Sequence, residues 1–140
     1  MVGGMVAGLF RRVAMRVACL VAIGAGPLAA QEAQPGSAAY NSCMAKAQTT
    51  VDMVSCMNDE MALQDKALNM VYQQALAALP VDQRQKLRAA QRVWLDFRQK
   101  DCDVFYGKET GTIASIDAGG CMIRHTVSRI GDLRLIAERP

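Results

Sequence analysis

The chain has only one histidine, His125, and no two of its cysteines are separated by two residues. A structural zinc site needs four nitrogen or sulfur ligands, usually in closely spaced pairs, so the sequence gives no basis for one. Ser115 and Ser128 have no base or orienting group at a recognisable spacing, and no phosphate loop or nucleotide fingerprint is present. We therefore expect no metal, no cofactor and no enzymatic activity.

A surplus of positive charge is also missing once the first 30 residues are set aside. The chain holds 16 basic and 13 acidic residues, and Arg11, Arg12 and Arg16 lie in an N-terminal segment without acidic residues. The remaining 13 basic residues therefore balance 13 acidic ones. Binding to nucleic acid or to an anionic membrane depends on a surplus or cluster of Lys and Arg, so neither is an expected partner.

No apolar run is long enough to cross a membrane. The longest, residues 17–28, falls short of the about 20 residues that a spanning helix needs. It follows the basic segment and precedes the small residues Ala29 and Ala30, which is the pattern of a secretory signal peptide. We expect residues 1–30 to be removed, leaving a periplasmic or secreted protein with no integral membrane segment.

Helical periodicity dominates the mature chain, and no segment alternates as a strand would. Residues 31–42 are small and polar and predict a flexible tail. One helix is predicted from about Thr49 to Pro80, with Thr49 or Thr50 as its cap. A second runs from Val81 to about Asp103, and its expected buried stripe is Leu87, Ala90, Trp94 and Phe97.

The helix boundaries follow from local signals. Asp82, with Gln85 three residues later, has the spacing of a capping box. Residues 104–120 are ambiguous, because their four glycines favour a loop while Ile113-Ala114-Ser115-Ile116 could begin a helix. A third helix is clear from about Cys121. Because the connection at Pro80 is short, the first two helices should form an antiparallel hairpin. The prediction is a small all-α bundle, residues 43–140, built from this hairpin and a C-terminal helix.

Polar side chains follow one stripe of each hairpin helix, at spacings of three, four and seven. Folding at Pro80 predicts that Asp65 meets Arg98 and that Asn69 meets Gln91. Such a buried polar seam fixes the register of packed helices, and a role in binding would require it to reach solvent. The predicted polar seam consists of Asp65, Asn69, Tyr72, Gln91, Trp94 and Arg98.

Four cysteines remain after signal cleavage, and an even number in an exported chain indicates two disulfides, with three possible pairings. Cys56 lies nine residues before Asp65, half a revolution around the helix, and so points away from the seam. Cys102 follows Arg98 by one turn and lies on the seam side, which argues against a bond between them. We favour the two short-range pairs, Cys43–Cys56 and Cys102–Cys121.

These motifs resemble the LprI-type lysozyme inhibitor family of small secreted helical proteins, over about residues 43–137. The matching motifs are Asp65-x-x-Leu68-Asn69-x-x-Tyr72, Ala90-Gln91-x-x-Trp94-x-x-Phe97-Arg98-x-x-x-Cys102, and Cys121 followed by Thr126-x-x-Arg129-x-x-x-Leu133. The resemblance implies an exported all-α domain. It also implies inhibition of lysozyme, an activity of one class of members.

Two functions from different classes remain open. One is inhibition of lysozyme-type muramidases through protein–protein binding, and the other is a non-inhibitory interaction or structural role in the cell envelope. The partner would be lysozyme or another envelope protein. Four acidic residues are candidates for the contact surface: Asp59, Glu60, Asp101 and Asp103.

A methionine repeat offers a weaker alternative. Met53, Met57 and Met61 recur every fourth residue on one helix. Thioethers bind copper(I), but methionine more often fills irregular gaps in a core.

Overall fold

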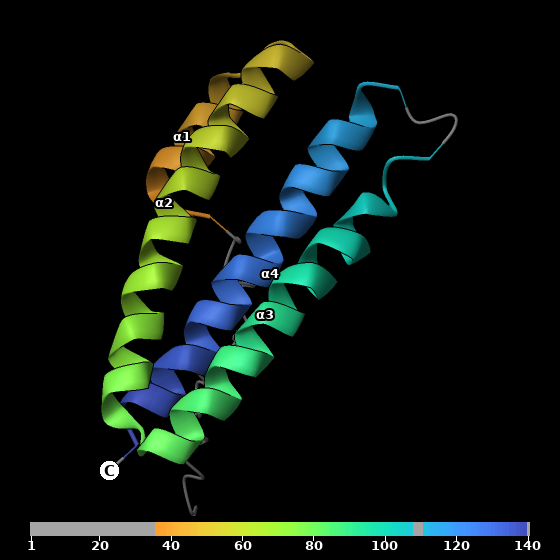
Figure 1. Ribbon diagram of the computed structural model, residues 1–140. Coiled ribbons are helices and arrows are strands. Elements are labelled where there is room, and N and C mark those ends of the chain that lie inside the picture. Colours follow the sequence, from red (N-terminus) through yellow and green to blue (C-terminus); the bar gives the residue numbers. More distant parts are fainter. Residues whose placement is uncertain (1–35, 108–110, 140) are drawn as a thin grey trace, which may run out of the picture. The chain divides into compact units, whose positions relative to one another are not determined.

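The computed structural model describes residues 36–107 and 111–139, and within them every regular element is an α-helix. The helices are α1 (Ala38–Lys46), α2 (Thr50–Ala78), α3 (Val81–Asp103) and α4 (Ile113–Ala137) (Figure 1). The predicted all-α, disulfide-stapled bundle is thereby confirmed. The predicted signal peptide lies outside the described residues. No helix among those described combines the length and apolar character that crossing a membrane requires.

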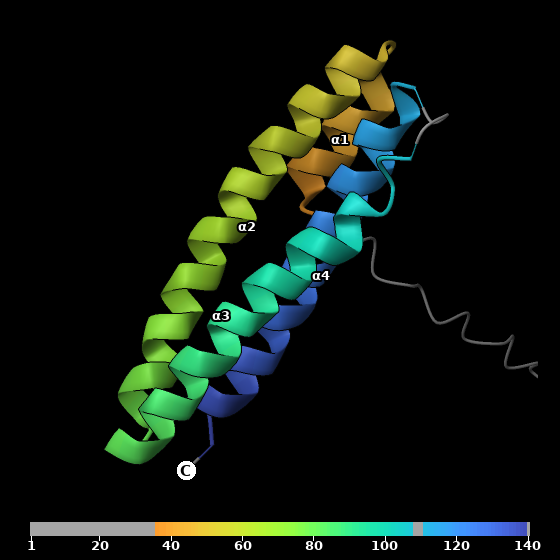
Figure 2. The same cartoon turned by 45° about the vertical axis from the view of Figure 1, so that its right-hand side comes forward.

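Helix α4 packs against both arms of the predicted hairpin. Two views show it running alongside α2 and alongside α3 (Figures 1 and 2). Backbone contact is most extensive between α2 and α4, while α1 packs on α2 and α3 packs on α4. The helices α2 and α3 are antiparallel, joined at Pro80, but α4 supplies most of the surface on which α2 is buried.

The apolar core lies toward the Pro80 turn. Its central residue is Leu133 of α4, which is fully buried, and each fully buried side chain of this size stabilises the fold by about 1.5–3 kcal/mol. Partly buried residues, including Tyr72 and Trp94, pack around the edge. The buried members of the cluster are Leu68, Val71, Ala75, Leu76, Leu87, Ile130 and Leu133.

The expected tail over residues 31–42 was wrong for its last part, because residues 38–42 belong to α1. Ser37 caps this helix by accepting a hydrogen bond from the Tyr40 N–H. The Ser37 N–H and hydroxyl in turn donate to Glu60 of α2, at 2.9 and 2.6 Å. These bonds and a disulfide at Cys43 fix a segment whose composition alone predicts a flexible tail.

Thr49 is the N-cap of α2, and it forms a capping box with Asp52, as one of the two sequence alternatives proposed. The predicted capping by Asp82 was wrong. The helix α3 follows directly from Pro80, and no side chain caps its first turn. Asp82 is therefore already inside the helix, where its negative charge still favours the N-terminus.

Two disulfides join neighbouring helices, and both match the pairs favoured from the sequence. Cys43 of α1 is bonded to Cys56 of α2, with a Cα–Cα distance of 5.8 Å. Cys102, near the end of α3, is bonded to Cys121 of α4, with a Cα–Cα distance of 5.6 Å. Each bond therefore fixes the connection between two consecutive helices.

Helix α4 begins at Ile113, so the helical one of the two interpretations of this ambiguous segment is the one that the structure has. Ala114 and Ala118 are buried on the same stripe as Cys121, so small residues allow close packing here. A Cβ atom on Gly119 would lie only 2.8 Å from the Sδ atom of Met57. The glycine that weakened the helical pattern is thus explained by the approach of a methionine from α2.

The contact between Ser37 and Glu60 predicts a pH-dependent stability. Burial raises the pKa of Glu60, but hydrogen bonds from the Ser37 hydroxyl, the Gln64 amide and the Ser37 N–H outweigh it, so the pKa lies below its ordinary value. This stabilisation is present above the unfolded-state pKa and is lost as the pH falls through the lowered folded-state pKa.

Glu60→Gln should therefore lower the melting temperature at neutral pH, and the gap from the wild type should close on acidification. Thermal melts followed by circular dichroism from pH 7 to pH 3 measure this gap. Asp59→Asn, at the exposed neighbouring position, is the matched control. A gap that stays constant over this pH range would contradict the role given to the Glu60 carboxylate.

Candidate functional site

Arg98 joins three helices through one guanidinium group. Its Nη1 atom lies 3.2 Å from Oδ1 of Asp65 on α2 and donates to Oγ1 of Thr126 on α4 at 2.7 Å. Its Cζ atom lies 5.0 Å from the centre of the Trp94 ring, a cation–π distance. The Asp65–Arg98 contact predicted from the sequence is present, and Thr126 is a third participant that the hairpin geometry alone did not indicate.

The second predicted contact was wrong. The Oε1 atom of Gln91 accepts a hydrogen bond from Nε of Arg129 at 3.0 Å, while Asn69 is exposed. Arg129 also lies 5.9 Å from the Trp94 ring. Because α4 packs on α3 at this level, its arginine reaches Gln91 and takes the place expected for Asn69.

The part of the seam contributed by α3 and α4 is buried, while the Asp65 side chain on α2 keeps 48% of its surface accessible. Gln91 is 7% exposed, Arg98 is 9% exposed and Thr126 is fully buried. Thr126 also donates to the Met122 carbonyl, so its hydroxyl is satisfied on both sides. Within the described residues no acceptor reaches the buried Nε atom of Arg98. Groups this deeply buried present little surface to another macromolecule.

The buried stripe of α3 differs from the one expected. Its buried residues are Leu87, Gln91, Arg98 and Cys102. Ala90 and Phe97 are exposed instead, and Phe97 keeps half of its surface accessible. The face of α3 that contains Gln91 and Arg98 packs against α4, and Phe97 therefore faces solvent.

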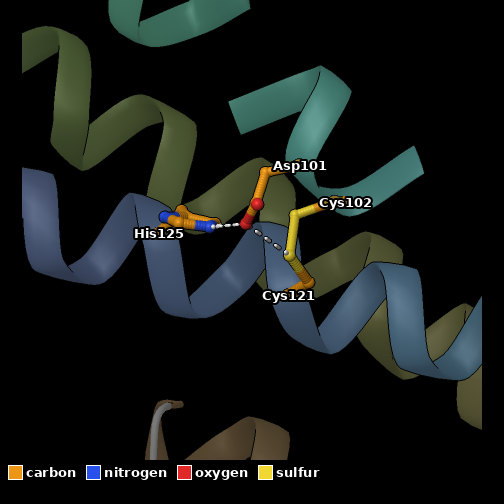
Figure 3. A group of neighbouring side chains, drawn as sticks. All are labelled: Asp101, Cys102, Cys121 and His125. Carbon is orange, nitrogen blue, oxygen red and sulfur yellow. Dashed lines mark hydrogen bonds and ion pairs between the residues drawn. A yellow bond between two sulfur atoms is a disulfide. The ribbon is translucent and has the colours of Figure 1, made fainter. Parts of the chain in front are cut away.

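A second pair of polar residues, Asp101 and His125, lies beside the Cys102–Cys121 disulfide (Figure 3). Nε2 of His125 lies 2.7 Å from Oδ2 of Asp101, and the His125 ring meets the Phe97 ring edge-on at 5.3 Å. The two sulfur atoms are bonded to each other and do not offer the thiolate ligands that zinc prefers. The pairing of Cys102 with Cys121 could have indicated this contact, since Asp101 precedes one cysteine and His125 follows the other by one turn.

Exposed aromatic residues gather where α3 ends. Tyr106 is 58% exposed, Phe97 is 50% and Phe105 is 38%, and Val104 between them is 77% exposed. The backbone stays ordered past the helix, since the N–H groups of Phe105 and Tyr106 donate to the carbonyls of Cys102 and Asp103. Val104, Phe105 and Tyr106 follow Cys102 closely in the chain, and Tyr106 lines a cavity together with Cys102.

Charge is divided between the two ends of the bundle, although residues 31–140 are neutral overall. The level of the Asp65–Arg98–Thr126 contact separates a loop end, residues 36–64, 99–107 and 111–125, from a turn end, residues 65–98 and 126–139. The loop end contains six acidic and three basic residues, and the turn end contains five acidic and nine basic ones. The loop end is therefore acidic and the turn end is basic, although residues 31–140 have no net charge.

The four candidate acids lie at the loop end, but only three of them are exposed. Asp59, Asp101 and Asp103 are accessible, whereas Glu60 is 3% exposed and is engaged by Ser37 and Gln64. The prediction of Glu60 as a surface acid was therefore wrong.

Only two of the three repeated methionines line the same cavity. Met57 and Met61 line a cavity of about 330 Å³ together with Met122 of α4, and Met53 is not among the lining residues. Met57 packs directly against Gly119. This contact fits the gap-filling role of methionine between closely approaching helices.

Comparison with models of known protein families gives a match over most of the chain. The model of the family described as lysozyme inhibitor LprI matches residues 42–133. This range includes α2 and α3, both disulfides and α4 as far as Leu133. No curated protein and no solved structure matches the chain.

Removing the Arg98 side chain should destabilise the fold. Arg98→Leu takes away a hydrogen bond to buried Thr126 and an ion pair with Asp65, at an expected cost of about 1.5–3 kcal/mol. The melting temperature should fall by roughly 5–15 °C for a domain of this size. Asn69→Ala, at an exposed position on the same helix as Asp65, should change the melting temperature little. Equal melting of both variants and the wild type would contradict the structural role of the seam.

Proposed function

Because the chain belongs to the LprI lysozyme inhibitor family, we propose that the mature protein binds lysozyme-type muramidases and blocks hydrolysis of the cell wall. The observation that carries this proposal is the match of the family model over residues 42–133. Inhibition by binding requires no catalytic groups of its own. Such inhibition requires a rigid surface that keeps its conformation on contact with the enzyme.

The cross-linked bundle supports such a mechanism. Muramidases cleave glycosidic bonds with carboxyl groups in a cleft that the polysaccharide must enter. A protein that covers this cleft competes with a large substrate, and a preorganised surface loses less conformational freedom on binding. Here Cys43–Cys56 and Cys102–Cys121 hold consecutive helices together, and Arg98 connects α2, α3 and α4.

Export supports the same proposal. Disulfides persist in oxidising compartments such as the periplasm and the extracellular space, and both pairs of cysteines in the described residues are bonded. The signal-peptide pattern over residues 1–30 gives a route to these compartments. The protein would thus be placed in the compartment where muramidases attack the wall.

The proposal predicts that purified mature protein, residues 31–140, slows the lysis of bacterial cell walls by lysozyme. Turbidity decay measured with several lysozyme types over a range of molar ratios gives the dose dependence. A disulfide-bonded protein of similar size and unrelated sequence is the control for nonspecific effects.

Binding of the protein to the same lysozymes is measured on a biosensor. Slower lysis without measurable binding would mean that the assay mixture, and not the protein, lowers lysozyme activity. Undiminished lysis at a large molar excess, for every lysozyme type tested, would contradict the proposal. It would instead favour a non-inhibitory interaction or structural role in the envelope.

A further inference from the structure

We propose that the loop end is the surface that contacts the muramidase, with Val104 and Tyr106 as apolar contacts and Asp103 and Asp117 as part of an acidic surround. This inference rests on the proposed function and deepens it by naming the contact surface. The occupant is a muramidase with a positively charged surface around its cleft. Three independent properties of the loop end support this assignment.

The first property is the distribution of exposed aromatic side chains. Within the described part of the chain, Phe97, Phe105 and Tyr106 are the aromatic residues with more than a third of their surface accessible. All three lie within ten consecutive residues around the end of α3, and Phe105 and Tyr106 belong to the loop end. Aromatic residues are enriched among those that dominate binding energy, because they bury a large area with few rotatable bonds.

Exposed apolar residues elsewhere have a different character. Val81, Val93 and Leu135 at the turn end are accessible, but all three are aliphatic. Singly exposed aliphatic residues are normal on the surface of a soluble protein and need no partner. Val104 differs from them because it stands directly between the end of α3 and two aromatic residues. Among the large apolar residues of 36–107 and 111–139 it is the most exposed.

The second property is charge. The loop end has six acidic residues against three basic ones, and the turn end has five against nine. Complementary charge speeds association and orients the partners before contact. A basic enzyme is therefore attracted to the loop end and repelled by the turn end, even though the mature chain as a whole is neutral.

The third property is rigidity at the base of the contact surface. Cys102 is 1% exposed and is bonded to Cys121 immediately before the exposed residues begin. The Asp101–His125 contact at 2.7 Å also joins the last turn of α3 to α4 beside this disulfide. Val104 and Tyr106 are thus presented from a cross-linked support, which lowers the entropic cost of binding.

The turn end offers the main alternative surface. A groove of about 600 Å³ lies there, lined by apolar residues such as Leu79 and Ile136 and flanked by Lys86 and Arg139. Its basic flanks would repel a basic enzyme. Exposed residues elsewhere at the turn end therefore serve as matched controls.

The test compares paired variants of the mature protein by biosensor binding to a basic lysozyme and by inhibition of lysis. Val104→Ala combined with Tyr106→Ala should weaken binding by about tenfold or more. Val81→Ala combined with Leu135→Ala, at exposed turn-end positions, should change binding by less than about twofold. Thermal melts of all variants verify that they remain folded.

A second pair isolates the charge contribution. Asp103→Lys combined with Asp117→Lys should slow association at low salt, with the difference shrinking as salt is added. Asp132→Lys combined with Glu138→Lys makes the same change in net charge at the turn end and should leave association nearly unchanged.

The outcomes separate this inference from the function on which it rests. If wild-type protein inhibits lysozyme but the turn-end variants lose binding while the loop-end variants keep it, the contact surface is wrong and the function stands. If the wild type neither binds nor inhibits any lysozyme tested, both are overturned. Selective loss in the loop-end variants supports both.

Discussion

The arrangement of the bundle depends on the placement of one guanidinium group. Arg98 contacts a carboxylate on α2, a hydroxyl on α4 and an aromatic ring on its own helix. A charged group that is 9% exposed is costly to bury unless partners surround it, and these three lie on different helices. The requirement to satisfy Arg98 therefore fixes how α2, α3 and α4 meet, while the apolar core around Leu133 supplies the driving force for their association.

Sequence reasoning identified the helices of the hairpin and the family from periodicity and motifs. It identified the Asp65–Arg98 contact and the two cysteine pairs from the turn at Pro80 and from the helix faces on which these residues lie. It failed where a third helix changes the geometry. Asn69 was placed against Gln91 on the assumption that α2 and α3 face each other directly, but Arg129 of α4 occupies that position. Similarly, Gly119 argues against a helix until Met57 is known to pack against it. These contacts join residues far apart in the chain and leave no periodic signal.

The candidate contact surface was hidden from the sequence for a related reason. Summing charge over residues 31–140 gives zero, and only the folded arrangement separates an acidic loop end from a basic turn end. Phe97 likewise has the spacing of a core residue, and it is exposed because the polar stripe of α3 faces α4. Local composition could indicate which residues are aromatic or acidic, but not which of them are exposed at the loop end.

The two disulfides also determine how the chain responds to a break in its backbone. Each bond links consecutive helices, and neither spans the turn at Pro80. A single cut in that turn would leave two covalently separate halves, α1 with α2 and α3 with α4, held together only by the core and the Arg98 contacts. A cut between α3 and α4 would leave the pieces joined through Cys102–Cys121. The loop end is thus the end at which the chain can be cut and still remain one covalently joined molecule.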